Sequence, residues 1–498
     1  MSIPVELIEQ NPWWKKPDEI KLDKNIVALK ESKIDWIPRI MYSFDLGTDI
    51  VYTLRGPRQV GKTTLLKRMI KNLLEGGVPP RQIFYFTCDL IDNPKSIVET
   101  VSKYLDAVRP SNERAYIFLD EVSSVRNWQK GIKYLHDKGR LTSTTVLLTG
   151  SHTLDIKKAS ERLPGRRGIS EDVLDKIMLP MKFAEYTGTL NKDIRERILG
   201  HHLLSRGKRR EMLFLLLEGK IPDEIKDLSF FSKELNLLFS DYLLTGGIAK
   251  VINEFLKQTY IPQSLYKTYL DVVIGDILAW NKRDSYLRQV VSRTVETLGS
   301  PVGWNTLKKG TDISSHNTVQ QYIETLAASF VVIYLYHYTP SRHGPDYAKN
   351  KKMHFHDPFF FHAMRSWINR KDPFELALDY LKDPENVGVL VESVVADHLV
   401  RLAFQLCEQK QLFAYENSLF YWRGKNDREI DFVLCAPNKK VIPIEVKYQP
   451  DISRSDKYGL IDFMKNTGTP RGFILSKDTL EITRDTTIIP VWLFLLFV

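Results

Sequence analysis

The sequence is poor in cysteine and has no long apolar run. Its cysteines, Cys88, Cys407 and Cys435, lie far apart and form no C-x-x-C pair, which excludes a disulfide framework and a zinc ribbon and fits a reducing compartment. The first residues lack the basic and apolar segments of a secretory signal. The longest apolar run, residues 488–498, is interrupted by Pro490 and is shorter than the roughly 20 residues of a spanning helix. We therefore expect a cytoplasmic chain without membrane contact, whose last segment is buried in a core.

The composition is that of a folded chain with several domains. Hydrophobic residues make up 43% and charged residues 27% of the 498 positions, which excludes a disordered or collagen-like protein. This length predicts about two to four domains. The net charge of +10, from 71 Lys+Arg against 61 Asp+Glu, favours a nucleic-acid partner. A basic protein without such a partner fits the charge equally well.

An apolar strand, a glycine-framed loop and a helix follow one another between residues 49 and 74. The loop has the pattern G-x-x-x-x-G-K-[ST], in which glycines let successive N–H groups point at a phosphate. The start of the helix adds partial positive charge. Lys62 would hold the β- and γ-phosphates, and Thr63 would offer its hydroxyl to Mg²⁺. We predict an ATP site formed by Gly56, Pro57, Arg58, Gln59, Val60, Gly61, Lys62, Thr63 and Thr64.

A second acidic motif is predicted to join the same site. Residues 115–120 end an apolar run in aspartate, which is typical of a buried parallel strand, and this places Asp120 beside the P-loop. There Asp120 can bind Mg²⁺, and Glu121 can polarise the attacking water as general base. The alternative is an ordinary strand that ends in an acidic turn.

Three further strands are predicted, at residues 83–87, 145–149 and 176–179, and they complete the α/β pattern of a P-loop core with a parallel sheet. Ser151 follows one of them and could sense the γ-phosphate or position the water. Arg166 lies on a basic loop and could stabilise phosphoryl-transfer charge, in cis or from a neighbour in a homo-oligomer. A solvated loop that touches no nucleotide is equally compatible.

The middle of the chain is predicted to be helical and then to form a winged helix. Residues 284–356 contain three helical patterns followed by a two-stranded ribbon, and the third helix of such a module can enter a major groove of DNA. Winged helices also serve as protein–protein modules, so this alternative stays open. The candidates for groove contact are Ser315, His316, Asn317 and Gln320 or Gln321.

The C-terminal block contains a second set of charged residues. Glu392 lies beside the apolar stripe of a predicted helix, and a buried charge needs a partner. Strand alternation in a predicted hairpin places Asp431, Glu445 and Lys447 on one face. These groups suit metal-assisted phosphodiester hydrolysis, with Asp431 and Glu445 holding Mg²⁺, Lys447 orienting or activating water, and Glu392 supporting a ligand. The alternative is a surface ladder of ion pairs.

These motifs together resemble those of archaeal and bacterial AAA-type ATPases that carry a winged helix and a C-terminal restriction-endonuclease-like domain. The resemblance covers nearly the whole chain and includes the spacing D-x₁₃-E-x-K in the second site. It implies ATP and Mg²⁺ as cofactors, DNA as a partner and Arg166 as the arginine-finger candidate. Ile248-Ala249 departs from the family, which often has a proline there. The implied domains are a P-loop core at 1–183, a helical region at 184–283, a winged helix at 284–356 and a restriction-endonuclease-like domain at 357–498.

Two functions are compatible with these predictions. The first is an ATP-hydrolysing, DNA-associated enzyme, with metal-dependent nuclease activity as an open option. The second is a regulatory nucleotide switch, an interaction protein whose nuclease-like domain is catalytically inactive and serves for docking.

Overall fold

The computed structural model of the chain describes residues 4–109, 113–150, 161, 163, 165–170, 172–278, 282–424, 427–437 and 440–498. The chain divides into two units, Met1–Leu179 and Pro180–Val498. The core predicted at residues 1–183 ends four residues beyond this division, since 183 − 179 = 4. The other three predicted segments fall in the second unit.

The first unit is built on a parallel sheet with the strand order β2-β3-β4-β1-β5. This confirms the α/β class, because each strand lies within two residues of its predicted range. Strand β1 lies between β4 and β5, so the loop after β1 leaves the sheet beside the carboxyl ends of its neighbours. The strands are β1 (Val51–Arg55), β2 (Ile83–Thr87), β3 (Ala115–Asp120), β4 (Thr144–Thr149) and β5 (Asp175–Ile177).

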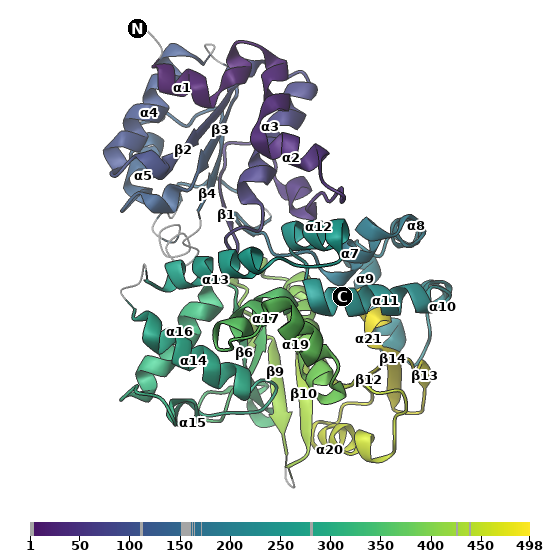
Figure 1. Cartoon of the computed structure of the whole chain (residues 1–498). Helices are drawn as coiled ribbons and strands as arrows, with labels where there is room; N and C mark the ends of the chain where they lie inside the picture. The colour runs from purple at the N-terminus through teal and green to yellow at the C-terminus, as the bar shows by residue number, and fades with distance from the viewer. Residues whose placement is uncertain are drawn as a thin grey trace. The chain divides into compact units, whose positions relative to one another are not determined.

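Helices cover both faces of this sheet, which explains why β1 to β4 are mostly apolar. Helices α4 (Pro94–Ala107) and α5 (Gln129–Asp137) pack on one face, and α3 (Lys62–Glu75) packs on the other (Figure 1). Successive residues of β3 alternate between the two cores: Phe118 packs with α3, whereas Leu119 packs with α4 and α5.

An N-terminal segment covers the outer edge of β2. It consists of α1 (Val5–Gln10), two short 3₁₀ helices (Pro12–Trp14 and Pro17–Leu22) and α2 (Lys24–Lys30). The buried Asn11 side chain acts as a strand partner: its Nδ2 donates to the Tyr85 carbonyl oxygen at 2.8 Å, and its Oδ1 accepts from the Tyr85 N–H at 2.7 Å. The first residues of the chain therefore complete the sheet of the first unit.

The second unit begins with helices, as predicted for the middle of the chain. By length and composition, none of the described helices could cross a membrane alone, whereas α11 and α12 pass that test as a pair bent by 112°. The helices are α7 (Phe183–Leu190), α8 (Lys192–Gly200), α9 (Arg206–Leu217), α10 (Asp223–Ser229), α11 (Ser232–Thr245), α12 (Ala249–Gln258) and α13 (Gln263–Leu278).

Three helices and three strands occupy the segment for which a winged helix was predicted. They are α14 (Asp284–Glu296), α15 (Trp304–Lys308), α16 (His316–Ala328), β6 (Val332–Thr339), β7 (Gly344–Asp346) and β8 (Lys352–Phe355). Strand β6 pairs with β7 and β8 on antiparallel ladders, and it also pairs in parallel with β9 (Leu419–Arg423), where Tyr336 lies opposite Phe420. The ribbon is therefore part of the same sheet as the strands that follow residue 356.

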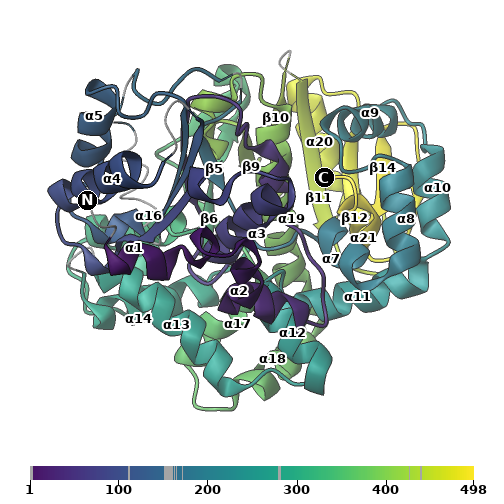
Figure 2. The same ribbon diagram turned by 90° about the horizontal axis from the view of Figure 1, so that it is seen from above.

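That sheet is mixed and has nine strands, in the order β13-β14-β12-β11-β10-β9-β6-β7, with β8 paired to β6. Helix α20 packs on the sheet, where Leu460 and Phe463 meet Ile430 and Val433, and Figure 2 shows this part in yellow and green. Residues 488–498 are buried, as expected for a core segment. The remaining elements are α17 (Pro358–Trp367), α18 (Pro373–Leu381), α19 (Pro384–Leu406), β9 (Leu419–Arg423), β10 (Glu429–Ala436), β11 (Lys440–Lys447), α20 (Tyr458–Thr467), β12 (Gly472–Ser476), β13 (Glu481–Ile482), β14 (Thr486–Pro490) and α21 (Val491–Phe494).

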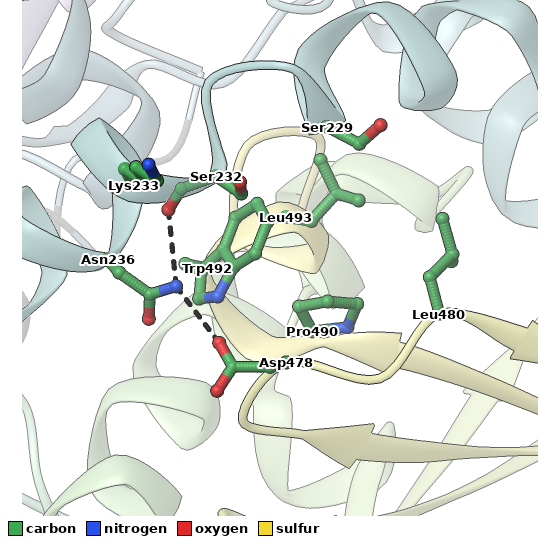
Figure 3. A pocket seen from close by; sticks show the side chains of 9 residues that line it. All are labelled: Ser229, Ser232, Lys233, Asn236, Asp478, Leu480, Pro490, Trp492 and Leu493. Atoms are coloured by element: carbon green, nitrogen blue, oxygen red, sulfur yellow. Dashed lines mark hydrogen bonds between the residues drawn. The ribbon is translucent and has the colours of Figure 1, made fainter. Parts of the chain in front are cut away.

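A cavity of about 350 Å³ lies near the C-terminal helix α21. Asn236 spans part of it: its amide nitrogen donates to Asp478 at 3.0 Å and to the Ser232 carbonyl oxygen at 3.2 Å (Figure 3). Trp492 and Leu493 supply apolar wall. None of the site residues predicted from the sequence lines this cavity.

The edge contact of Asn11 gives a stability prediction. Asn11→Leu removes both hydrogen bonds to Tyr85 and leaves a backbone N–H and a carbonyl without partners, so we expect a loss of about 2–4 kcal/mol in the free energy of unfolding of the first unit. Urea unfolding of the full chain, with hydrogen exchange at residues 83–87, measures it. The control Asn93→Ala removes a side-chain cap from α4 and should cost about 1 kcal/mol. Unchanged exchange at β2 in Asn11→Leu would contradict the role of Asn11.

Candidate nucleotide site and carboxylate cluster

The P-loop backbone takes a shape that only glycine allows at its first position. Gly56 has a φ of 151°, and a Cβ atom there would lie 2.0 Å from the carbonyl oxygen of Met178. Gly61, with a φ of 107°, precedes the first residue of α3. Glycine is therefore required at the two positions for different reasons. At Gly56 another backbone segment comes too close for a Cβ atom, and at Gly61 the backbone takes a left-handed conformation before the helix.

The lysine of the loop lies inside the loop. The Lys62 side chain is buried, and its Nζ donates to the carbonyl oxygens of Gly56 and Pro57, each at 3.0 Å. The ammonium group therefore lies across the concave side of the loop, where the motif predicts phosphate. Pro57, Arg58, Gln59 and Val60 form the rest of the loop between the glycines.

Asp120 lies beside the P-loop, and hydroxyl groups from three elements donate to it. Thr63 donates from α3 to Oδ2 at 2.7 Å, and Tyr85 donates from β2 to the same oxygen at 3.0 Å. Thr149 donates from β4 to Oδ1. Burial, and then the charge of Asp120, raise the pKa of Tyr85, so this phenol stays a proton donor. The backbone N–H of Glu121 donates in turn to Thr149 at 3.2 Å.

Three of the predicted residues, Thr63, Asp120 and Glu121, line one cavity of about 740 Å³, whereas residues 56–62 and Thr64 do not line it. The hydroxyl of Thr63 and the carboxylate of Asp120 are oxygen ligands of the kind that Mg²⁺ prefers, and they already lie within hydrogen-bond distance of each other. The donor set therefore fits a magnesium ion that also contacts a bound triphosphate.

The sequence did not predict the opposite wall of this cavity, which the N-terminal segment forms. Asp23 and Asn25 line it, together with Lys67 from α3. The buried Lys67 Nζ lies 3.3 Å from Asp23 and 3.4 Å from the ring centroid of Tyr85, and burial lowers the pKa of Lys67. The sequence did contain one indication that Lys67 belongs to this site: Lys67 follows Thr63 by four residues, so both lie on one face of the helix.

The two remaining candidates of the first unit differ in outcome. Ser151 lies outside the described residues. Arg166 donates from Nε to Asp137 at 2.7 Å, at the end of α5, and the next residue, Arg167, accepts from the Val51 N–H with its carbonyl oxygen. Val51 is the first residue of β1, whereas the P-loop follows the last. The structure therefore does not bring Arg166 to the P-loop of its own chain.

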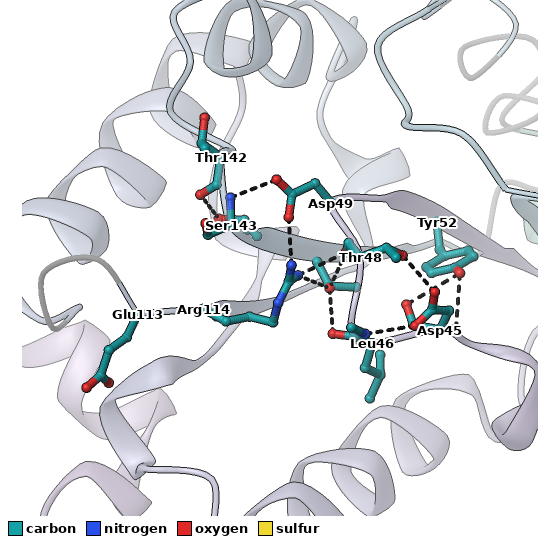
Figure 4. Close-up of polar contacts among 12 residues, drawn as sticks. Asp45, Leu46, Thr48, Asp49, Tyr52, Glu113, Arg114, Thr142 and Ser143 are labelled. Carbon is teal, nitrogen blue, oxygen red and sulfur yellow. Dashed lines mark hydrogen bonds and ion pairs between the residues drawn. The ribbon is translucent and has the colours of Figure 1, made fainter.

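Polar contacts stabilise the edge of the sheet at which the strands begin (Figure 4). Asp49 accepts from Arg114 and from the Ser143 N–H, each at 2.8 Å, and so connects the segments that enter β1, β3 and β4. Thr145 donates to the Thr48 carbonyl oxygen at 2.7 Å. The edge opposite the P-loop is thus closed by contacts within the unit.

In the second unit, β10 and β11 bring the predicted hairpin residues together, as strand alternation predicts. The Asp431 N–H donates to Glu445 Oε2 at 3.3 Å, and the Val446 N–H donates to Asp431 Oδ2 at 2.8 Å. Lys447 Nζ lies 2.6 Å from Glu445 Oε1. The pairing of β10 with β9 shifts between Ile430 and Val433, next to Asp431, and such an irregularity changes where a side chain points.

A lysine that the sequence analysis did not single out joins Glu392 to this group. Lys352, on β8, has a side chain that is 1% exposed. Its Nζ lies 3.0 Å from Glu392, 2.8 Å from Glu429 and 2.5 Å from Asp431. We call Lys352, Glu392, Glu429, Asp431, Glu445 and Lys447 the carboxylate cluster. The available signal was a lysine on a short strand whose other residues, Met353, His354 and Phe355, are rarely found with a charged neighbour in a core.

Burial controls the protonation of this cluster. Burial and then the charge of Asp431 raise the pKa of Glu392 and of Glu445 to about 8 each. For Asp431, burial raises the pKa, but Lys352 and Lys447 together outweigh it and hold the pKa below its usual value. The cluster therefore holds an ionised Asp431, and its two buried glutamates bind protons more tightly than exposed glutamates do. Among the described residues, no three His, Cys, Asp or Glu side chains are placed to hold a metal ion.

Helix α19, which carries Glu392, is anchored one turn further on by a buried ion pair. Asp397 Oδ2 accepts from Arg401 Nε at 2.8 Å, and Asp397 Oδ1 lies 2.9 Å from His356 Nδ1. Arg401 also donates to the Pro180 carbonyl oxygen at 2.9 Å. Burial raises the pKa of Asp397, but Arg401 and His356 outweigh it and lower it to about 2.

Three segments of the chain match known families. Residues 48–187 match an AAA domain (AAA_14), residues 236–371 a domain of unknown function (DUF8612), and residues 387–494 another domain of unknown function (DUF4143). The first match includes the P-loop and Asp120-Glu121. Residues 48–187 are therefore similar to an AAA domain, whereas the matches in the second unit assign no activity to the carboxylate cluster.

Two curated relatives are uncharacterized proteins. One, of Haemophilus influenzae, is 22% identical over 294 residues, which cover 57% of this chain and 62% of the relative. The other, of Methanocaldococcus jannaschii, is 22% identical over 336 residues, which cover 66% of this chain and 60% of the relative. The chain therefore spans about three fifths of the length of these relatives.

Solved structures that resemble the chain include a Walker-type ATPase of Pyrococcus abyssi, at 13% identity and a TM-score of 0.37, covering 70% of this chain and 97% of that chain. The ORC1 protein of Aeropyrum pernix in complex with DNA follows, at 13% identity and a TM-score of 0.28, covering 74% and 98%. RuvB of Thermotoga maritima has 16% identity and a TM-score of 0.26, covering 65% and 89%. Similarity at these scores does not define a function.

The raised pKa of Glu445 gives a pH prediction. The folded state binds this proton more tightly than the unfolded state, so the stability it contributes is full below about pH 4.5 and is lost as the pH rises toward about 8. Glu445→Gln removes this titrating group, so the free energy of unfolding should fall less steeply with rising pH than in the wild type, by up to about 1.4 kcal/mol per pH unit. Urea unfolding of the second unit from about pH 5 to 8 measures the slope. Glu481→Gln, at an exposed position of β13, is the matched control, and equal slopes in both variants would contradict the prediction.

Proposed function

We propose that the first unit binds ATP with Mg²⁺ and hydrolyses it. The observation that carries this proposal is that Thr63, Asp120 and Glu121 line one cavity beside the P-loop. The match of residues 48–187 to an AAA domain supports the same activity. A passive nucleotide binder would not need a carboxylate next to the metal ligand, and Glu121 follows Asp120 directly.

The residues of the site have separate tasks. The backbone N–H groups between Gly56 and Gly61 bind phosphate oxygens, and Lys62 exchanges its loop carbonyl partners for the β- and γ-phosphates. Thr63 and Asp120 would hold a magnesium ion, which would supply positive charge to offset the negative charge of the phosphates. Glu121 accepts the proton of the attacking water.

Tyr85 and Thr149 are positioning residues for this site. Each donates a hydrogen bond to Asp120 from a neighbouring strand, so the carboxylate stays oriented when Thr63 turns from Asp120 toward the metal ion. Arg166 lies at the edge of the sheet where the strands begin, whereas the P-loop of the same chain lies at the edge where they end. Arg166 can therefore act as an arginine finger only toward the P-loop of a second copy of the chain.

DNA is the partner that we propose for the second unit. The net charge of the whole chain, +10, favours a nucleic-acid partner, and in the second unit the start of α16 exposes His316, Asn317 and Gln321. Ser315 caps this helix, since its hydroxyl accepts from the Asn317 N–H at 3.2 Å.

The second candidate function, a nucleotide switch whose nuclease-like part only docks, is favoured by the lysine that lies among the carboxylates of the cluster.

Two substitutions separate binding from turnover. Lys62→Ala should abolish ATP binding, because the phosphates lose their cation inside the loop. Glu121→Gln should still bind ATP but turn it over at least about 100-fold more slowly, because the water loses its base. A fluorescent ATP analogue and phosphate release measure the two steps. Lys71→Ala, further along α3, is the matched control and should keep both. ATP hydrolysis by Lys62→Ala at the wild-type rate would refute the proposal.

DNA association is tested at α16. His316→Ala combined with Asn317→Ala should weaken binding of duplex DNA about 10-fold or more, as expected from the loss of groove contacts. Fluorescence anisotropy at two salt concentrations measures the affinity, which should fall as salt rises. Glu324→Ala, an exposed position on the same helix, should not weaken binding. If the wild-type chain binds no DNA at low salt, DNA is not the partner and the switch function remains.

A further inference from the structure

The carboxylate cluster of the second unit contains its own cation. The Lys352 ammonium group donates hydrogen bonds to Glu429 and Asp431, and it also forms an ion pair with Glu392, whose Oε2 lies 3.0 Å away. We propose that Lys352 takes the position that a divalent metal ion would occupy, so that this centre binds no metal ion and does not cleave phosphodiester bonds. This inference concerns the second unit and goes beyond the ATPase activity proposed for the first.

The predicted metal ligands have no oxygen without a protein donor. Asp431 Oδ1 is taken by Lys352, and Asp431 Oδ2 accepts from the Val446 N–H. Glu445 Oε1 is taken by Lys447, and Glu445 Oε2 accepts from the Asp431 N–H. A metal ion bound by Asp431 Oδ1 and Glu445 Oε1 would have to share these oxygens with the ammonium groups of Lys352 and Lys447. Mg²⁺ in particular demands near-ideal octahedral geometry, which the present arrangement does not offer.

Burial keeps Lys352 in place. Its side chain is 1% exposed, and removing a buried ammonium group from its carboxylates leaves both charges without compensation. A divalent ion that entered beside it would meet a positive charge about 3 Å away in a poorly screened interior. Lys352 and a metal ion therefore exclude each other.

The same geometry predicts what removal of the lysine would create. Oxygens of Glu392, Glu429 and Asp431 converge on Nζ from α19 and β10, and these are hard ligands for a divalent cation. Without the ammonium group, the three carboxylates would repel one another and attract a cation. Lys352→Met, which has an apolar side chain of similar length, should therefore gain a divalent-cation site that the wild-type chain lacks.

Electron paramagnetic resonance of Mn²⁺ tests this on the full chain without nucleotide. We expect no bound Mn²⁺ in the wild type up to about 1 mM and about one bound ion per chain in Lys352→Met. Adding Asp431→Asn to Lys352→Met should abolish that binding. Lys351→Met is the matched control: Lys351 is also buried, but its Nζ donates to the carbonyl oxygens of Tyr347 and Lys349, at 2.7 and 2.8 Å. It should bind no more Mn²⁺ than the wild type.

The wild-type chain provides a test that does not depend on the folding of any lysine variant. Its melting temperature without nucleotide should be the same in Mn²⁺ and in chelator, and DNA incubated with the chain and Mn²⁺ should stay intact. Mn²⁺ bound by the wild type and lost in Asp431→Asn would overturn the proposal, as would metal-dependent cleavage that Asp431→Asn abolishes. Since nucleotide is absent from this test and the cluster lies in the second unit, failure of this proposal would leave the ATPase proposal untouched.

Discussion

The close approach of two backbone segments, at Gly56 and Met178, sets the geometry of the first unit. The Met178 N–H donates to the carbonyl oxygen of Arg55 at 2.8 Å, and no Cβ atom fits at position 56. Because the chain after β5 passes this close, the loop after β1 leaves the sheet in one direction and α3 starts at Lys62. The second residue of that helix then meets Asp120 from β3. The nucleotide site thus depends on one contact between backbones.

The two units neutralise buried carboxylates by different means, and the difference decides what each can bind. Asp120 is held by hydroxyl groups, and a hydroxyl oxygen that donates a proton can also become a metal ligand. Asp431 is held by an ammonium group, which has no lone pair and can only repel a cation. The first arrangement is open to Mg²⁺, whereas the second is complete as it stands.

Much of the first site could be predicted because its signals are local. The P-loop, the apolar strands and the Asp120-Glu121 pair are all spelled out within short segments, and parallel strands bring their carboxyl ends to one edge. Alternation likewise placed Asp431, Glu445 and Lys447 on one face. Lys352 lies 79 residues before Asp431, and Asn11 lies 74 residues before Tyr85. Strand periodicity says which face a side chain takes but not which distant strand or helix packs on that face, so these partners required the structure.

The Asn11 contact has a consequence for how copies of this chain can associate. One border of the five-stranded sheet is occupied by the N-terminal segment, and the other border is β5, which has only three residues. Neither border offers a long row of backbone N–H and carbonyl groups to another molecule. Fibre-like growth by strand addition is thereby disfavoured for the first unit. If copies associate through the first unit, side chains on its helices and loops must make the contacts, which leaves the order of the strands, and with it the phosphate loop, intact.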